Sequence, residues 1–105
     1  MNLRLSADTI RLRVSRQEAR VLEEASELQE SLSIPGRPIL LSVQLRDNVE
    51  GDASFFATDT AMQALLKRSE LLRLLDESAS PRDCISREID PQSKLQFIFE
   101  IDLHS

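Results

Sequence analysis

The sequence has few of the residues from which common functional sites are built. It contains one cysteine, Cys84, and one histidine, His104, among 105 residues. A single cysteine excludes a disulfide within the chain and fits a reducing compartment. Because zinc sites need several ligands, usually in closely spaced pairs, we expect neither a metal site nor a cofactor. A Cys–His nucleophilic couple would require the C-terminal end to fold back onto Cys84.

Glycine and aromatic residues are also scarce. The only two glycines, Gly36 and Gly51, leave no glycine-rich loop that could cradle a phosphate. Four phenylalanines, without tryptophan or tyrosine, predict a mostly aliphatic core and offer little surface for stacking on bases or sugars. No apolar run approaches the length of a transmembrane helix, and the N-terminal end does not resemble a signal peptide. We therefore expect a cytoplasmic protein with no membrane partner.

Acidic residues outnumber basic residues by 18 to 13, which gives a net charge of −5. Nonspecific nucleic-acid binding depends on a basic surface, so no nucleic-acid partner is expected. Eleven of the basic residues are arginine. Arginine binds carboxylates and phosphates through planar, bidentate hydrogen bonds, although a biased genome composition is the more ordinary explanation of this excess.

The N-terminal region predicts a strand that leads directly into a helix. Residues 10–14 alternate apolar and arginine side chains, which is typical of a half-buried strand. Ser15 and Glu18 form a capping-box pattern, so a helix should begin there and end near Ala25 or Ser26. Residues 1–6 predict a preceding strand, which would pair with residues 10–14 as a hairpin.

The remaining chain predicts further strands and a second helix in one domain, residues 1–105. Residues 60–77 allow two interpretations: one long helix, or a strand at about 61–65 followed by a helix over 67–77. We expect an α+β fold, with a largely antiparallel sheet of six or seven strands and two helices packed on it. The further strands are expected at residues 28–34, 39–45, 53–57, 84–89 and 95–101.

A weak internal similarity suggests two related ββαβ halves. Ser15–Glu18 and Lys67–Glu70 lie 52 residues apart, which is about half the chain length. Each segment would open a helix after a strand. The similarity therefore favours the strand-plus-helix interpretation of residues 60–77.

Several short motifs resemble a small family of uncharacterised bacterial proteins of about this length. The family has a basic strand, a tight turn, an Ile-Arg-Leu-Arg strand and a Ser/Thr-capped helix. Its pattern implies a strand leading into a helix in the middle of the chain, but it brings no established activity. The present sequence departs from it at Ala61–Leu66, which lacks β-branched alternation, and at its end, where relatives often carry a cysteine. The motifs that carry the resemblance are Leu3–Leu5, Asp8–Ser15 with Glu18, Asp52–Phe55 and Glu100–Leu103.

The arginines near the N-terminus form one candidate site. Arg4 and either Arg11 or Arg13 would share one face of the hairpin, with Arg16 near the start of the helix. Such a group of guanidinium ions could bind a phosphate or carboxylate. A solvated sheet face, paired with acidic residues from the next strand, is the simpler interpretation.

The second predicted helix carries more leucine than one buried stripe needs. We expect Leu72 and Leu75 to contribute to a contact patch for a protein partner or a second copy. The segments 27–32 and 82–85 are the least hydrophobic strand candidates, and we expect them nearest the sheet edges.

The sequence lacks a persuasive set of acid–base or nucleophilic residues, so it favours a protein that is not an enzyme. The leading prediction is a noncatalytic protein-interaction or assembly module. The alternative is a small-anion or nucleotide-phosphate binding protein, including a phosphohydrolase, that uses the arginine face of the N-terminal hairpin. The sequence identifies neither the partner nor the oligomeric state.

Overall fold

The computed structural model describes residues 1–80 and 83–102, over which the chain forms eight strands and two α-helices. The element order is ββαββ, repeated once along the chain. The first half contains β1 (Asn2–Leu5), β2 (Thr9–Ser15), α1 (Arg16–Ala25), β3 (Glu27–Leu32) and β4 (Ile39–Arg46). The second half contains β5 (Ala53–Ala57), β6 (Ala61–Lys67), α2 (Arg68–Leu75), β7 (Ile85–Asp90) and β8 (Leu95–Asp102), after a short 3-10 turn at Glu50–Asp52.

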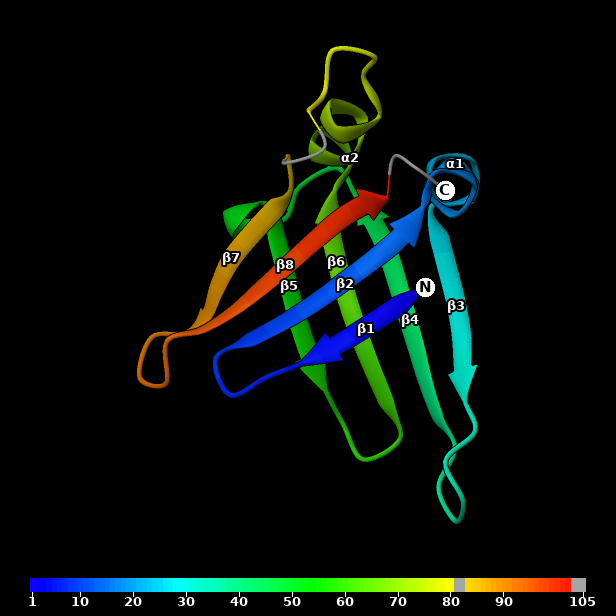
Figure 1. The fold of residues 1–105 in the computed structure, drawn as a ribbon, viewed down its shortest axis with the longest axis vertical. Coiled ribbons are helices and arrows are strands. Elements are labelled where there is room, and N and C mark those ends of the chain that lie inside the picture. Colours follow the sequence, from blue (N-terminus) through cyan, green and yellow to red (C-terminus); the bar gives the residue numbers. More distant parts are fainter. Residues whose placement is uncertain (81–82, 103–105) are drawn as a thin grey trace.

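The strands form two four-stranded sheets that pack face to face (Figure 1). The strand order is β1-β2-β8-β7 in the first sheet and β3-β4-β6-β5 in the second. Each sheet has a parallel pair at its centre, flanked by an antiparallel pair on either side. The predicted α+β class is confirmed, whereas the single, largely antiparallel sheet of six or seven strands is wrong.

The reason for the difference is that the two halves of the chain exchange strands. The hairpin β1-β2 pairs with β8 of the second half, and β6 of the second half pairs with β4 of the first. Alternation along each strand shows that one face is buried but does not say which strand lies alongside. Two facing layers bury the apolar face of all eight strands, as in a β-sandwich.

The two halves repeat with the spacing that the sequence suggested. β2 and β6 are related by 52 residues, and so are the residues that precede the two helices, Ser15 and Lys67. Residues 60–77 are therefore a strand followed by a helix, as the second interpretation predicted. Each repeated unit is ββαββ, one strand longer than the ββαβ half suggested by the sequence.

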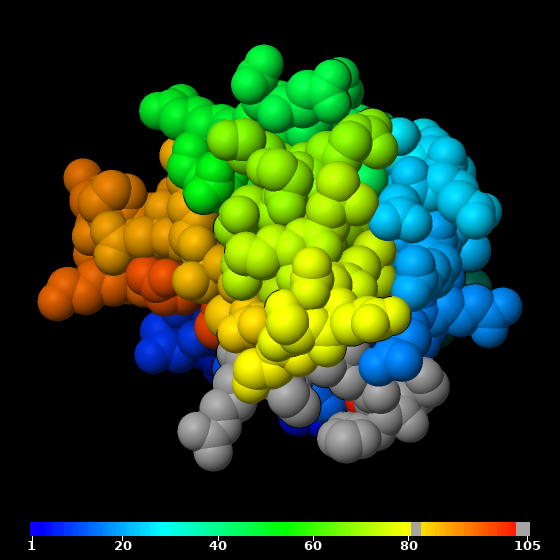
Figure 2. Space-filling view, turned by 90° about the horizontal axis from the view of Figure 1, so that it is seen from above, coloured from blue at the N-terminus to red at the C-terminus, as the bar shows by residue number. Residues whose placement is uncertain are grey.

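Both helices lie at the same end of the sandwich, rather than on a face of either sheet (Figure 1). Figure 2 looks onto this end, where α2 (yellow-green) lies between α1 (blue) and β7 (orange). Ala19 and Leu22 of α1 and Leu71 and Leu74 of α2 are buried in the core. Neither helix of the described residues is long and apolar enough to cross a membrane.

A single core fills the space between the sheets and beneath the helices. The rings of Phe55 and Phe97, one from each sheet, stack with their centroids 5.2 Å apart. The core includes five apolar residues of the alternating segments, and their alternation predicts that they are buried together. They are Leu12, Val14, Val43, Phe97 and Phe99.

The start of α1 has the predicted capping box. The hydroxyl of Ser15 accepts the backbone N–H of Glu18 at 3.0 Å, and the Glu18 carboxylate accepts the backbone N–H of Ser15 at 2.9 Å. The other Glu18 oxygen lies 2.6 Å from the amino group of Met1. This one carboxylate therefore joins the beginning of β1 to the beginning of α1.

Charged side chains on the two edge strands β3 and β7 connect the two sheets. Glu30 of β3 lies 3.4 Å from the amino group of Met1, which precedes β1 in the other sheet. Arg87 of β7 donates to the backbone oxygen of Glu50 and, at 2.8 Å, to that of Ala53 at the start of β5. Residues 27–32, predicted to lie near a sheet edge, form the edge strand β3. Of the second predicted segment, 82–85, Ile85 begins the edge strand β7, whereas Arg82 lies outside the described residues.

Phe97→Ala should lower the free energy of unfolding by about 3–5 kcal/mol, because it empties a fully buried aromatic site. Chemical denaturation of dilute protein measures the change. Phe56→Ala is the matched control, since its ring is exposed, and it should change stability by no more than about 0.5 kcal/mol. Equal effects of the two substitutions would contradict a core centred on β8.

Glu18→Gln should reduce stability near neutral pH more than in acid. Burial alone would raise the pKa of Glu18, but hydrogen bonds from the Met1 amine and Ser15, with the charge of the amine, hold it below its usual 4.5. The ionised form therefore stabilises the fold above that pH, and this contribution is lost as the pH falls through the lowered pKa. Glutamine keeps the capping hydrogen bond but not the charge.

Urea denaturation at a series of pH values tests this expectation. The stability difference between the original protein and Glu18→Gln should shrink as the pH falls below 4.5. Glu24→Gln, on the exposed side of the same helix, should stay within about 0.5 kcal/mol of the original protein. A difference for Glu18→Gln that is the same at every pH would show that the charge contributes nothing.

Candidate functional site

The outward face of the first sheet carries three of the four predicted arginines. The antiparallel register places Arg4 of β1 directly opposite Arg11 of β2, and Asn2 opposite Arg13. Paired residues project from the same side of a sheet, so these four side chains form one group. The parallel register with β8 adds Glu100 beside Arg13.

Glu100 neutralises part of this positive charge. Its carboxylate accepts from Arg13 Nε at 3.0 Å and from Arg11 Nη1 at 3.3 Å. The Glu100 side chain is only 13 % exposed, whereas those of the two arginines are about half exposed. The expectation of an acidic partner from a neighbouring strand therefore holds for Arg11 and Arg13, which share one carboxylate.

Arg4 differs from its two neighbours. It has no hydrogen bond or ion pair with any residue of the described part of the chain. It faces Arg11 across the β1–β2 pair, an arrangement of like charges that is destabilising in a sheet. With Asn2, Arg11 and Arg13 it lines a small cavity of about 80 Å³. We call this cavity the arginine pocket.

A wider hollow continues from the arginine pocket toward the β1–β2 turn. It has a volume of about 320 Å³ and shares Arg4 and Arg11 with the pocket. Ser6 and Thr9, at the turn, add hydroxyl groups to its lining. The two hollows together offer guanidinium, amide and hydroxyl donors, which is the chemistry that binds an oxyanion.

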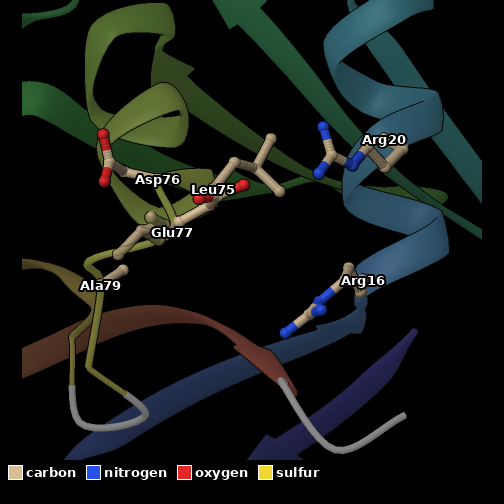
Figure 3. Close-up of a pocket in the computed structure, with 7 residues that line it drawn as sticks. Arg16, Arg20, Leu75, Asp76, Glu77 and Ala79 are labelled. Carbon is tan, nitrogen blue, oxygen red and sulfur yellow. The ribbon is translucent and has the colours of Figure 1, made fainter.

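The structure places Arg16 away from this group. Arg16 begins α1, where the chain turns toward the end of the sandwich, and its side chain lines a separate groove between the helices (Figure 3). Arg20 projects from α1 beside it, toward Leu75. The groove has a volume of about 250 Å³, and its other wall is formed by Leu74, Leu75, Asp76, Glu77 and Ala79. This wall includes two acidic residues, so the groove carries charges of both signs.

The two leucines predicted to contact a partner differ in exposure. Leu72 is 46 % exposed on α2. Leu75 is partly buried against the core and lines the groove between the helices. The adjacent Leu71 and Leu74 are buried, so the surplus leucine on the surface is Leu72 alone.

Cys84 and the acidic residues of the 47–52 loop lie apart from the arginine pocket. Cys84 is a half-buried free thiol, while His104 lies outside the described residues. Asp47 and Asp52 pair with Arg68 and Lys67 of the second half. Over residues 1–80 and 83–102, no three His, Cys, Asp or Glu side chains come close enough to hold a metal ion.

The repeated fold allows the arginine pocket to be compared with the same place in the second sheet. The 52-residue offset between the halves relates Arg4 to Phe56, Arg11 to Gln63 and Arg13 to Leu65. The second sheet therefore has no charge at any of the three positions. Sequence reasoning missed Asn2 and Glu100 as members of the site, because the parallel β2–β8 register was needed to find Glu100.

Comparison of the chain with protein-family models, curated proteins and solved structures gives no match. The resemblance to a bacterial family therefore stays a prediction. The functional assignment rests on the geometry of the arginine pocket.

Proposed function

We propose that the protein is a noncatalytic binding module, and that the arginine pocket holds a phosphate or carboxylate group of its partner. The observation that carries this proposal is the placement of Arg4 opposite Arg11 without a carboxylate of its own among the described residues. An anion between the two guanidinium groups would remove their repulsion and satisfy their donors.

Glu100 supports this role by holding two of the arginines in place. Its carboxylate accepts hydrogen bonds from Nε of Arg13 and Nη1 of Arg11. The other N–H groups of both guanidinium ions remain available to a ligand. Asn2 adds an amide donor at the pocket wall. Three guanidinium groups against one carboxylate leave the site positively charged, although the chain as a whole is acidic.

The four residues that line the pocket favour binding over turnover. Asn2 and the three arginines supply hydrogen bonds and positive charge, but none is a nucleophile or a general base at neutral pH. A phosphohydrolase would need such a group within reach of the bound phosphate. The nearby Glu100 carboxylate is already engaged by Arg11 and Arg13, and the hydroxyls of Ser6 and Thr9 line the wider hollow rather than the pocket itself. We therefore rank binding above hydrolysis.

The second sheet supplies an internal argument that the arginines serve function rather than folding. Phe56, Gln63 and Leu65 occupy the corresponding positions in a sheet of the same topology. The fold is thus compatible with uncharged side chains there. A facing pair of arginines, which costs stability, is then best explained by a ligand.

A protein contact through α2 is the second candidate function. Leu72 is a large apolar side chain that is nearly half exposed on a short helix. A partner that carries an acidic group could contact both the arginine pocket and a more distant apolar residue. Leu72→Glu should then weaken binding of such a partner without weakening that of free phosphate.

Arg4→Gln and Arg11→Gln should each weaken binding of inorganic phosphate or citrate by about tenfold or more, since each removes a charge-assisted hydrogen bond. Isothermal titration at low salt measures the affinity, and the two anions distinguish phosphate from carboxylate recognition. Without ligand, Arg4→Gln should be at least as stable as the original protein, because it removes a like-charge pair.

Arg46→Gln is the matched control, as Arg46 is an exposed arginine on a strand of the other sheet. It should leave the affinity for both anions unchanged. The proposal would be overturned if neither anion bound, or if the Arg4→Gln, Arg11→Gln double variant bound them as the original protein does.

A further inference from the structure

The four edge strands of the two sheets are unequally protected against pairing with another strand. β3 carries the inward-facing Glu30, and β7 carries the inward-facing Arg87 together with a bulge between Glu88 and Asp90. β1 presents Arg4. Charges, inward-pointing charged residues and bulges are the usual means of protecting an edge. β5, with the sequence Ala-Ser-Phe-Phe-Ala, contains no charged residue.

The outer edge of β5 has unpaired backbone groups beyond its buried first residue, Ala53. The hydrogen bond from Thr58 N–H to the Ala61 oxygen shows which residues of β5 bond to β6. Because bonded residues alternate along an antiparallel strand, the backbone N–H and C=O groups of Ser54 and Phe56 point toward β6. Ala53, Phe55 and Ala57 then direct their N–H and C=O groups away from the sheet. Arg87 donates a hydrogen bond to the backbone oxygen of Ala53. No described residue forms a hydrogen bond with the outward N–H and C=O groups of Phe55 or Ala57.

The outward face of this sheet exposes two large apolar side chains. Phe56 is 47 % exposed there, and Leu40 of β4 is 37 % exposed on the same face. Both helices lie at the end of the sandwich, so neither covers this face (Figure 1). β5 therefore combines free hydrogen-bonding groups with an exposed aromatic ring.

We infer that β5 pairs antiparallel with β5 of a second copy, which joins two four-stranded sheets into one continuous sheet. The pairing places Phe55 opposite Ala57 of the second copy, and Ala57 opposite its Phe55. Each such pair exchanges two backbone hydrogen bonds, which satisfies the free groups while leaving the Ala53 oxygen to Arg87. Phe56 then lies opposite Phe56 of the second copy, in the closer type of cross-strand pair.

A second copy fits this edge better than a charged segment does. Because β5 is uncharged, its pairing with itself opposes no like charges, whereas self-pairing of β1 would bring Arg4 toward its own copy. In the proposed register Asp59 falls opposite Ala53 of the second copy. The guanidinium of Arg87 lies at that residue, so charges of opposite sign meet at both ends of the pairing. The inference does not depend on anion binding by the arginine pocket.

Sedimentation equilibrium over a range of concentrations, with two variants, tests the pairing. Phe56→Lys sets two cations opposite each other, and Ala57→Pro removes an N–H group that points away from β6. Each should weaken dimerisation by tenfold or more while the melting temperature of dilute protein changes little. In the original protein, the amides of Phe55 and Ala57 should exchange hydrogen more slowly as the protein concentration rises.

Leu5→Lys and Leu72→Lys are matched controls, because both replace exposed leucines outside the proposed interface. They should leave dimerisation unchanged. A protein that stays monomeric at millimolar concentration would overturn the inference. So would a dimer that survives both β5 substitutions, or one that Leu72→Lys dissociates, which would instead place the contact on α2.

Discussion

The parallel pairs β2–β8 and β4–β6 hold the two halves of the chain in one structure. Each pair joins a strand of one half to a strand of the other, so neither half completes a sheet alone. The apolar faces of the two resulting sheets can be buried only against each other, with Phe55 and Phe97 in contact across the gap. Helices α1 and α2 then close the end of the core where β2 and β6 lead into them (Figure 1).

This arrangement also explains two charged residues that face inward. Glu30 and Arg87 lie on the edge strands β3 and β7, where an inward charge can still reach solvent or a polar partner. Each contacts the chain at the start of the opposite sheet's edge strand, Glu30 at Met1 and Arg87 at Ala53. Glycine at position 51 accommodates this approach: its φ of 68° favours glycine, and a Cβ there would lie 2.7 Å from Arg87 Nε, so the arginine would have to shift. The same charges discourage pairing with other chains.

Comparison of the two ββαββ units distinguishes the positions at which the fold requires a particular kind of side chain from the positions at which it does not. Apart from Ser42, the buried residues are apolar in both halves. The outward faces differ, because the first sheet carries Arg4, Arg11 and Arg13 and the second has uncharged side chains at the same places. Since outward residues contribute little to the core, the two faces can acquire different roles. We propose anion binding at the outward face of the first sheet and self-association at the edge strand β5 of the second.

The sequence by itself determined the local elements. Alternating side chains located the strands, the Ser15–Glu18 pattern located α1, and the 52-residue similarity indicated that α2 begins near Arg68. The first two signals depend on neighbouring residues only, and the third is a comparison of two short segments of the same chain. Only the tertiary structure decided that the strands form two sheets, that Glu100 joins Arg11 and Arg13, and that Arg16 lies elsewhere. Partner choice between distant strands depends on how the whole set of apolar faces is buried at once, which no local pattern specifies.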